Sequence, residues 1–206
     1  MLVCPAVEIP RVFLGLAALV LSAGTARAGE VELSPFAGVQ YGGSVESVAS
    51  GRPRSFSAGF QYGGALDVAI GDGWGAEVHY SRQESELSGD DTVGRFELAV
   101  ERFLAGVWEE KGEGRTKVHG TFLLGVTRFT PGLGGFDSDV RFTAELGLGL
   151  KTRLSKHFGL RADVRGYFVV VDSGGGTVCS SGACLFRYSA TGLFQGDLTA
   201  GVVIVF

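Results

Sequence analysis

The closely spaced residues Glu77, His79 and Ser81 have the side-chain types from which a hydrolytic site is built. His79 and Ser81 are two residues apart, so in a β-strand they lie on the same face, where the imidazole could activate the hydroxyl as a nucleophile. Glu77 shares that face and could orient the imidazole. The competing interpretation is a polar cluster in the interior of the protein, without catalysis.

The His-x-Ser spacing is similar to that of outer-membrane lipid A deacylases, small barrels that hydrolyse an acyl ester of lipopolysaccharide. This sequence departs from the pattern of that family. In the family the pair comes late in the chain and an asparagine follows the serine, whereas here Arg82 follows Ser81 and the chain contains no asparagine. The alternation described below also points His79 and Ser81 into the interior, away from lipid. We therefore predict that the protein is not an enzyme and keep a lipid A-modifying esterase as an alternative.

Two cysteines, Cys179 and Cys184, stand close together in the sequence CSSGAC near the end of the chain. We expect them to form a disulfide, because the chain is predicted below to be exported to a compartment where disulfides form. The closed loop is short, so its effect should be local. Neither cysteine has a histidine clustered near it, and we expect no metal site and no other cofactor.

The elements that position these residues are easiest to recognise in the last stretch, 193–206. Its even-numbered residues are almost all apolar and its odd-numbered residues begin Gln195, Asp197, Thr199, which is the two-residue period of a half-buried strand. Phe206 ends the apolar stripe. Such a strand resembles the last strand of bacterial outer-membrane β-barrels. The resemblance implies that Phe206 is part of the signal that the barrel-assembly machinery reads.

The same alternation recurs along the chain in eight segments. The segments are 30–41, 56–70, 74–83, 95–109, 115–129, 140–153, 158–171 and 193–206. Each is long enough to cross a membrane as a tilted strand, and an even number of strands is typical of single-chain bacterial barrels. The predicted fold is therefore all-β, an eight-stranded antiparallel up-and-down transmembrane barrel that resembles the small OmpA/OmpX-like family.

The connections between these segments alternate in length. Those after the second, fourth and sixth segments are short, at 71–73, 110–114 and 155–157, and the others are long, polar and rich in glycine. In outer-membrane barrels short turns face the periplasm and long loops face the exterior. The sequence thus predicts localisation in the bacterial outer membrane with both termini periplasmic.

Residues 1–28 are predicted to be a signal peptide, which leaves 29–206 as a single barrel domain. Arg11 precedes the apolar run 12–21, and small alanines stand at the two positions that a signal peptidase inspects, Ala26 and Ala28. The run is too short to span a bilayer as a helix. The formal net charge of −4 argues against a nucleic-acid partner.

Each segment divides its residues between an apolar and a polar face, and aromatic residues of the apolar faces gather at both ends of the segments. Two aromatic girdles are typical of barrels whose apolar faces contact lipid. One expected girdle comprises Trp74, Trp108, Phe158 and Phe206, and the other comprises Tyr41, Phe56, Tyr80, Phe96, Phe142, Phe168 and Phe194. Eight strands enclose only enough space for their own side chains, so the polar faces should form a paired interior network. Its expected members are Glu32, Asp67, Glu77, His79, Lys117, His119, Arg141, Glu145, Lys151, Arg153, Arg161, Asp163, Arg165 and Asp197.

One segment does not fit this division. In residues 96–108 the even-numbered positions that place Trp108 on lipid also place Arg102 there, where a charge costs about 2 to 4 kcal/mol. We expect a bulge near Glu101 that turns Arg102 inward. Such a bulge would also remove Trp108 from the girdle unless a second irregularity restored it.

A filled interior favours a non-catalytic protein, whose loops make contacts outside while the barrel anchors them and contributes to envelope integrity. A narrow pore is a further alternative, because Lys151, Arg153, Arg161 and Arg165 lie on two neighbouring strands and could line an anion path. The expected partners are outer-membrane lipid and lipopolysaccharide, the barrel-assembly machinery, and an extracellular ligand at the loops. We expect a monomer.

Overall fold

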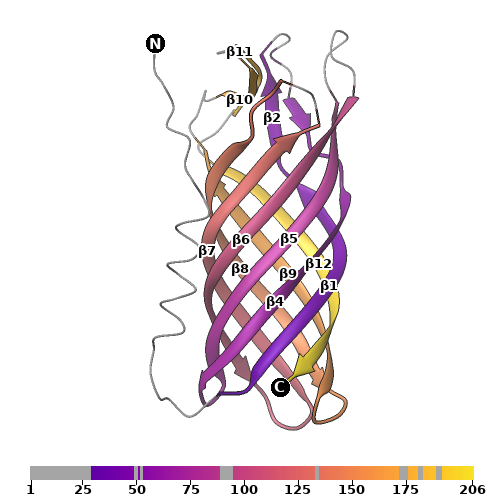
Figure 1. Cartoon of the computed structure of the whole chain (residues 1–206), viewed down its shortest axis with the longest axis vertical. Coiled ribbons are helices and arrows are strands. Elements are labelled where there is room, and N and C mark those ends of the chain that lie inside the picture. Colours follow the sequence, from indigo (N-terminus) through magenta and orange to yellow (C-terminus); the bar gives the residue numbers. More distant parts are fainter. Residues whose placement is uncertain are drawn as a thin grey trace.

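A computed structural model describes residues 29–48, 51, 53–88, 95–132, 135–171, 176–180, 183–188 and 192–206, and the predicted signal peptide lies outside them. Strands dominate these residues, among which no helix is long and apolar enough to cross a bilayer. Eight strands form a closed barrel (Figure 1). They are β1 (Val31–Gly42), β4 (Gly59–Gly71), β5 (Trp74–Ser88), β6 (Arg95–Lys111), β7 (Thr116–Pro131), β8 (Asp139–Arg153), β9 (Phe158–Val170) and β12 (Gly192–Val205).

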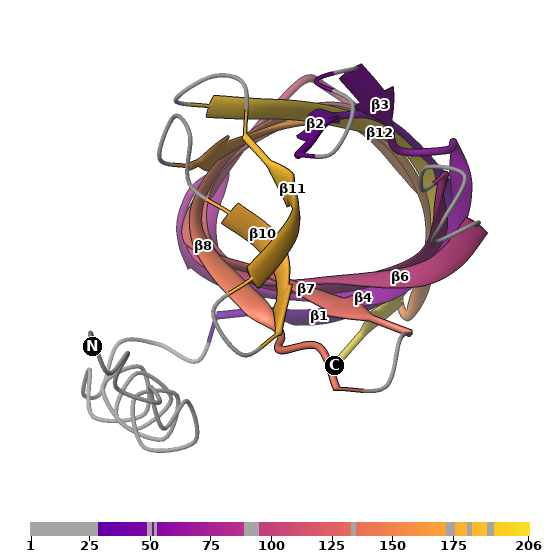
Figure 2. The same ribbon diagram turned by 90° about the horizontal axis from the view of Figure 1, so that it is seen from above.

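The barrel closes where its first and last strands pair, β1 with β12. The order around the barrel is β1-β12-β9-β8-β7-β6-β5-β4, and all neighbours are antiparallel. Seen along its axis the sheet makes a complete ring (Figure 2). The predicted eight-stranded up-and-down barrel is confirmed. The largest difference in bounds is at β5, which continues beyond residue 83 because its pairing with β6 extends to Ser88 and Arg95.

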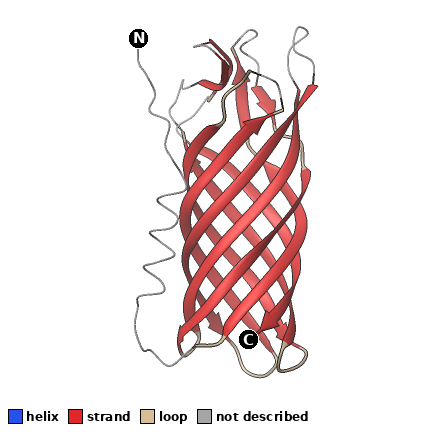
Figure 3. Ribbon diagram, in the orientation of Figure 1, coloured by secondary structure: helices blue, strands red, loops and turns tan. Residues whose placement is uncertain are grey.

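Three short connections lie at one end of the barrel, here called the turn end, together with the C-terminus (Figure 3). The opposite end, where the long connections lie, is called the loop end. Gly73 and Gly114 in the turns have φ values of 76° and 83°, which only a residue without a Cβ adopts at little cost. The sequence therefore predicts correctly that the connections alternate in length.

A second sheet of four short strands lies at the loop end, where the sequence predicts only loops. Its order is β10-β11-β2-β3, and it contains β2 (Ser44–Ser47), β3 (Pro53–Ser55), β10 (Gly176–Ser180) and β11 (Ala183–Arg187). Strands of three to five residues are too short to show a period in the sequence. In Figure 2, β10 and β11 cross above the ring of the barrel, so part of its mouth is covered.

The predicted bulge in β6 is wrong. The pairing of β6 with β5 and with β7 runs without a register shift past Arg102. The even-numbered residues Leu98, Val100, Arg102, Leu104 and Trp108 are buried inside the barrel instead. The side chain of Phe96, expected in a girdle, lies outside the part that the structure describes. Glu97 lies at an odd-numbered position of this strand, which the expected division would place inside, and it is exposed. The expected face of β6 was inverted because its interior face is itself largely apolar.

The outer wall of the barrel is apolar and the interior is rich in polar side chains. Leu146, Phe194 and Phe206 on the wall expose 68%, 68% and 74% of their surface, whereas many charged residues inside expose less than 5%. This is the reverse of a water-soluble barrel and requires an apolar surrounding. Large apolar residues are exposed near both ends, as predicted, but Phe56 and Trp108 are buried inside and do not belong to the girdles.

Candidate functional site: the filled interior and its covered mouth

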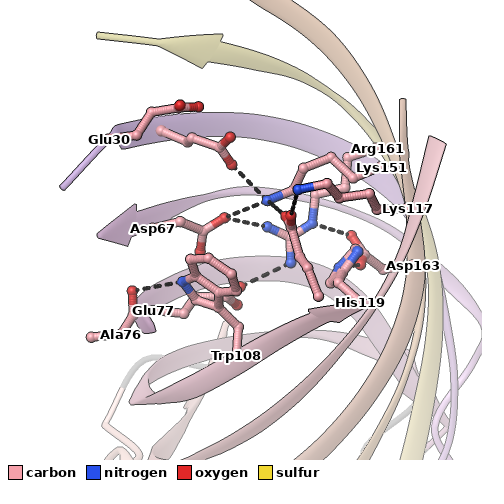
Figure 4. Close-up of polar contacts among 12 residues, drawn as sticks. Glu30, Asp67, Ala76, Glu77, Trp108, Lys117, His119, Lys151, Arg161 and Asp163 are labelled. Carbon is pink, nitrogen blue, oxygen red and sulfur yellow. Dashed lines mark hydrogen bonds and ion pairs between the residues drawn. The ribbon is translucent and has the colours of Figure 1, made fainter. Parts of the chain in front are cut away.

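Lys151 is the centre of an ion-pair cluster at the turn end of the interior. Its Nζ lies 2.6 Å from Glu32 Oε2, 2.8 Å from Glu110 Oε1 and 3.5 Å from Asp67 Oδ2. It also lies above the ring of Trp108, 5.2 Å from the ring centre. Glu32 and Asp67 lie opposite each other on the neighbouring strands β1 and β4, and Glu110 lies on β6. Lys151 comes from β8, which is not adjacent to any of these strands, so its ammonium group joins side chains across the bore (Figure 4).

Two arginines of β9 continue this network toward the middle. Arg161 contacts Asp67, Glu77 and Asp163 at 3.0, 2.9 and 2.7 Å. Arg165 contacts Glu77 at 2.9 Å and Glu145 at 3.4 Å. Since β9 does not neighbour β4 or β5 in the sheet, the arginines reach across the interior, which is therefore filled at this level.

Arg102 occupies the next level and has amide partners instead of carboxylates. Its guanidinium donates hydrogen bonds to Gln40 Oε1 at 2.7 Å and to Gln195 Oε1, and it lies 4.3 Å from the ring centre of Tyr167. The Tyr167 hydroxyl donates to Asp197 at 2.6 Å. Arg102 is thus connected to Asp197 through the ring and hydroxyl of Tyr167. These three residues, together with Gln40 and Gln195, are called the polar belt below, and all five are buried.

Apolar side chains fill the interior at the loop end, above the polar belt. The cluster, called the mouth cluster below, contains Val45, Phe56, Leu98, Val100, Phe129, Val169, Val171, Tyr188 and Leu193. Val45 comes from the small sheet and Tyr188 directly follows it. The small sheet of β2, β3, β10 and β11, called the covering sheet below, is therefore packed into the barrel through the same apolar contacts that close the mouth.

The covering sheet is held by polar contacts as well. Cys179 and Cys184 form the predicted disulfide between β10 and β11. The amide of Asp137, in the connection before β8, donates to the carbonyl of Cys179 at 2.9 Å. The Tyr188 hydroxyl donates to Asp139 Oδ2 at 2.8 Å, and Asp139 also contacts Arg141 at 2.9 Å. The disulfide-linked hairpin is in this way tied to the rim of the barrel.

His79 and Ser81 point into the interior and are not hydrogen-bonded to each other. Both ring nitrogens of His79 and the hydroxyl of Ser81 are buried without a hydrogen-bond partner. Glu77 Oε1 lies 3.8 Å from His79 Nδ1, and the imidazole stacks on Phe36 at 5.0 Å between ring centres. The carboxylate of Glu77 instead forms ion pairs with Arg161 and Arg165. The hydroxyl of Ser81 thus has no base hydrogen-bonded to it, and both side chains are enclosed by the barrel wall.

The described residues contain no group of three or more His, Cys, Asp or Glu side chains placed to hold a metal ion. Most interior carboxylates face basic side chains, as Asp163 does with His119 Nε2 at 2.6 Å, whereas Asp197 accepts hydrogen bonds from Tyr167 and Gln61. The chemistry of this interior is therefore that of a packed, charge-paired core.

The sequence profile of the outer membrane protein beta-barrel domain matches residues 14–193. The chain belongs to this family. Among solved structures, it is similar to Neisserial surface protein A, with 16% identity, a TM-score of 0.60 and coverage of 87% of this chain and 98% of that one. The outer membrane protein OprG from Pseudomonas aeruginosa has 14% identity, a TM-score of 0.54 and coverage of 87% and 97%. Likeness at these identities concerns the fold alone. A search of curated proteins finds no match.

The residues that were predicted to fill this outer membrane barrel occupy two kinds of position. Three of them lie at the rims and are partly exposed: Lys117 contacts Glu110, Arg141 contacts Asp139, and Arg153 contacts Glu30 and Glu32. The other members are buried: Glu32, Asp67, Glu77, His79, His119, Glu145, Lys151, Arg161, Asp163, Arg165 and Asp197.

Sequence reasoning missed three parts of the interior. It placed Glu110 in a turn, although this residue binds Lys151, and it did not foresee that glutamines such as Gln40 and Gln195 would bind Arg102. Gln40 and Gln195 lie at the polar, inward-facing positions of strands whose residues alternate between polar and apolar, so the sequence did indicate that they point inward. The mouth cluster gave no such signal, because apolar residues on an interior face look like residues on a lipid-facing one.

Proposed function

We propose that the protein is a non-catalytic outer-membrane anchor that displays its stapled covering sheet to the exterior and contributes to envelope integrity. The observation that carries this proposal is the filled interior beneath a covered mouth. The small sheet at the loop end, cross-linked by its disulfide, is a surface suited to contact rather than to passage.

The ion pairs argue against the narrow-pore alternative. Lys151, Arg153, Arg161 and Arg165 each contact at least two carboxylates, so they do not offer an anion an unpaired positive lining. The esterase alternative has a similar weakness, because His79 and Ser81 are fully enclosed. Both alternatives would require the interior to open.

The proposed orientation places the loop end outside and both termini in the periplasm. The family's short turns and long loops favour it. In this orientation Phe206, exposed at the turn end of the last strand, is available to the barrel-assembly machinery from the periplasm. We propose that the protein acts as a monomer, with a ligand contacting the covering sheet.

The experiment compares bacteria that lack the protein with bacteria complemented by the wild type or by a variant in which residues 176–187 are replaced by a short Gly-Ser turn. Detergent resistance measures envelope integrity, and attachment to polystyrene and to sister cells measures surface contact. The wild type should restore both properties. The hairpin variant should restore resistance but not attachment, since its barrel is intact.

Two results would overturn the proposal. Equal attachment by the hairpin variant would remove the covering sheet from the contact surface. Failure of the wild type to change either property would remove both proposed roles. Heat-modifiable migration of each variant on a gel, together with surface labelling, establishes that the barrels are folded and exported.

A further inference from the structure

Charged side chains on the outer wall are confined to one arc of the barrel. Among the described residues of β1, β4, β8, β9 and β12, the outward positions carry no charge. On β5, β6 and β7 the outward charges include Glu84, Glu97 and Glu109, which are exposed. They also include a row of three, Arg82, Glu101 and Arg128, which lie directly opposite one another in the strand pairing. Charges on a lipid-facing wall are costly unless they lie at an interface or find a partner.

This row of three charges lies at the level of the loop-end girdle. Arg82 pairs with Tyr62, which is exposed on the wall of β4. At the other end of the row, Arg128 pairs with Val140, and the next outward residue of β8 is the exposed Phe142. Aromatic side chains at this position mark the boundary between acyl chains and head groups. The arginines are therefore at the depth of lipid head groups.

The carboxylate of the row is already occupied. Glu101 accepts a hydrogen bond from the Tyr80 hydroxyl at 3.2 Å and one from Arg82 at 3.3 Å. Arg82 also lies 3.7 Å from Glu84, whose side chain is 73% exposed. Both carboxylates are thus engaged with Arg82, at the end of the row away from Arg128.

Three donors on this wall have no acceptor. The Nε atoms of Arg82 and Arg128 and the hydroxyl of Thr130 are buried and have no hydrogen-bond partner. Arg128 contacts no carboxylate in the part of the chain that the structure describes. Thr130 follows Arg128 on the same outward face of β7. Buried donors without acceptors are costly, and on a membrane wall the missing acceptor is an anionic lipid.

We propose that Arg82, Arg128 and Thr130 bind a phosphate group of lipid A from the outer leaflet. A phosphate presents several anionic oxygens in the geometry that guanidinium groups recognise, and a hydroxyl can donate to a further oxygen. The girdle depth of the row matches the position of lipid A phosphates when the loop end faces outward. In the cell, the site therefore rests on the orientation proposed above.

The test reconstitutes the purified protein in phosphatidylcholine nanodiscs that contain a small fraction of lipid A, and native mass spectrometry measures the lipid A that stays bound. Arg128→Gln should lose roughly tenfold in bound lipid A, as expected when a charge-assisted contact is removed. Lys156→Gln, in a turn at the opposite end, is the matched control because it removes the same charge, and it should bind like the wild type. Both variants are first checked for heat-modifiable migration.

Two ligand controls identify the source of the anion. Dephosphorylated lipid A and phosphatidylglycerol should both be retained less than lipid A, and excess inorganic phosphate should displace it only weakly. The proposal is overturned if Arg128→Gln retains as much lipid A as the wild type, if phosphatidylglycerol binds equally well, or if free phosphate replaces the lipid. Nanodiscs expose both ends of the barrel, so such a failure would concern this site and would leave the proposed anchoring function standing.

Discussion

The two halves of the interior are closed by different physical means. At the turn end, Lys151, Arg161 and Arg165 are held among carboxylates from several strands, and at the loop end apolar side chains pack beneath the covering sheet. Ion pairs need defined partners and lose much when one is removed, whereas an apolar cluster tolerates rearrangement at a cost set by volume. We therefore expect the turn-end half to be rigid and the loop-end half to be the part that can adapt.

Glu77→Gln should have the largest effect. Glu77 contacts Arg161 and Arg165, both at 2.9 Å, and the variant leaves two buried cations short of a partner, at a cost of about 3 to 5 kcal/mol in the free energy of unfolding. Urea unfolding of the protein in lipid vesicles measures this change in the free energy of unfolding. Glu84→Gln, on an exposed side chain of the same strand, is the control and should change stability by less than about 0.5 kcal/mol. Equal effects would mean that the ion pairs do not hold the turn-end half.

Val100→Ala tests the loop-end half. Val100 is fully buried in the mouth cluster, and losing its burial should cost about 1.5 to 3 kcal/mol. The matched control is Val107→Ala on the outer wall of the same strand, where the side chain is half exposed and the loss should be smaller. The interior variant should also increase protease cleavage of the covering sheet. A loss of stability without that cleavage would separate the cluster from the sheet.

Glycine substitutions compare the interior with the wall at one level. A Cβ at Gly149 would lie 2.3 Å from Asp163 Oδ1 and 2.6 Å from the carbonyl oxygen of Ala162, so Gly149→Ala should cost about 1 to 3 kcal/mol. At Gly120, on the neighbouring strand, the nearest atom would be 3.7 Å away. Gly120→Ala should therefore be almost neutral in the same unfolding measurement. If both were neutral, the interior would be less tightly packed than the contacts indicate.

Tyr188→Phe should have the smallest effect. It removes the hydrogen bond to Asp139 while keeping the ring in the mouth cluster, which should cost about 0.5 to 1.5 kcal/mol. The loss should appear as faster protease cleavage at 176–187 with an unchanged unfolding midpoint of the barrel. A lowered midpoint would mean that the covering sheet and the barrel unfold as one unit.

The fold could be predicted from the sequence because most strands have one apolar and one polar face. In β9 and β12 this alternation is nearly unbroken, and a single register satisfies it. In β6 it fails, because Leu98 and Val100 point inward to the mouth cluster while Glu101 is on the wall. Apolar character alone therefore does not identify the lipid-facing side.

The partners inside the barrel could not be predicted in the same way. The alternation of each strand places residues such as Glu32 and Lys151 in the interior, yet these two are separated by 119 residues and meet across the bore. Their contact depends on the stagger of all strands around the barrel, which no single segment encodes. The pairing of Arg128 with Glu101 on the wall, between the neighbouring strands β6 and β7, was missed for a different reason, because the expected face of β6 was inverted.

Conductance in planar bilayers tests most directly the claim that the interior is closed at both ends. The purified wild-type protein is inserted into a planar bilayer in molar potassium chloride, with a known porin as the positive control and protein-free detergent as the negative control. A filled, charge-paired interior predicts a current that stays at the baseline of the protein-free bilayer after insertion. Regular single-channel steps with a fixed ion selectivity would contradict the account and would favour the pore.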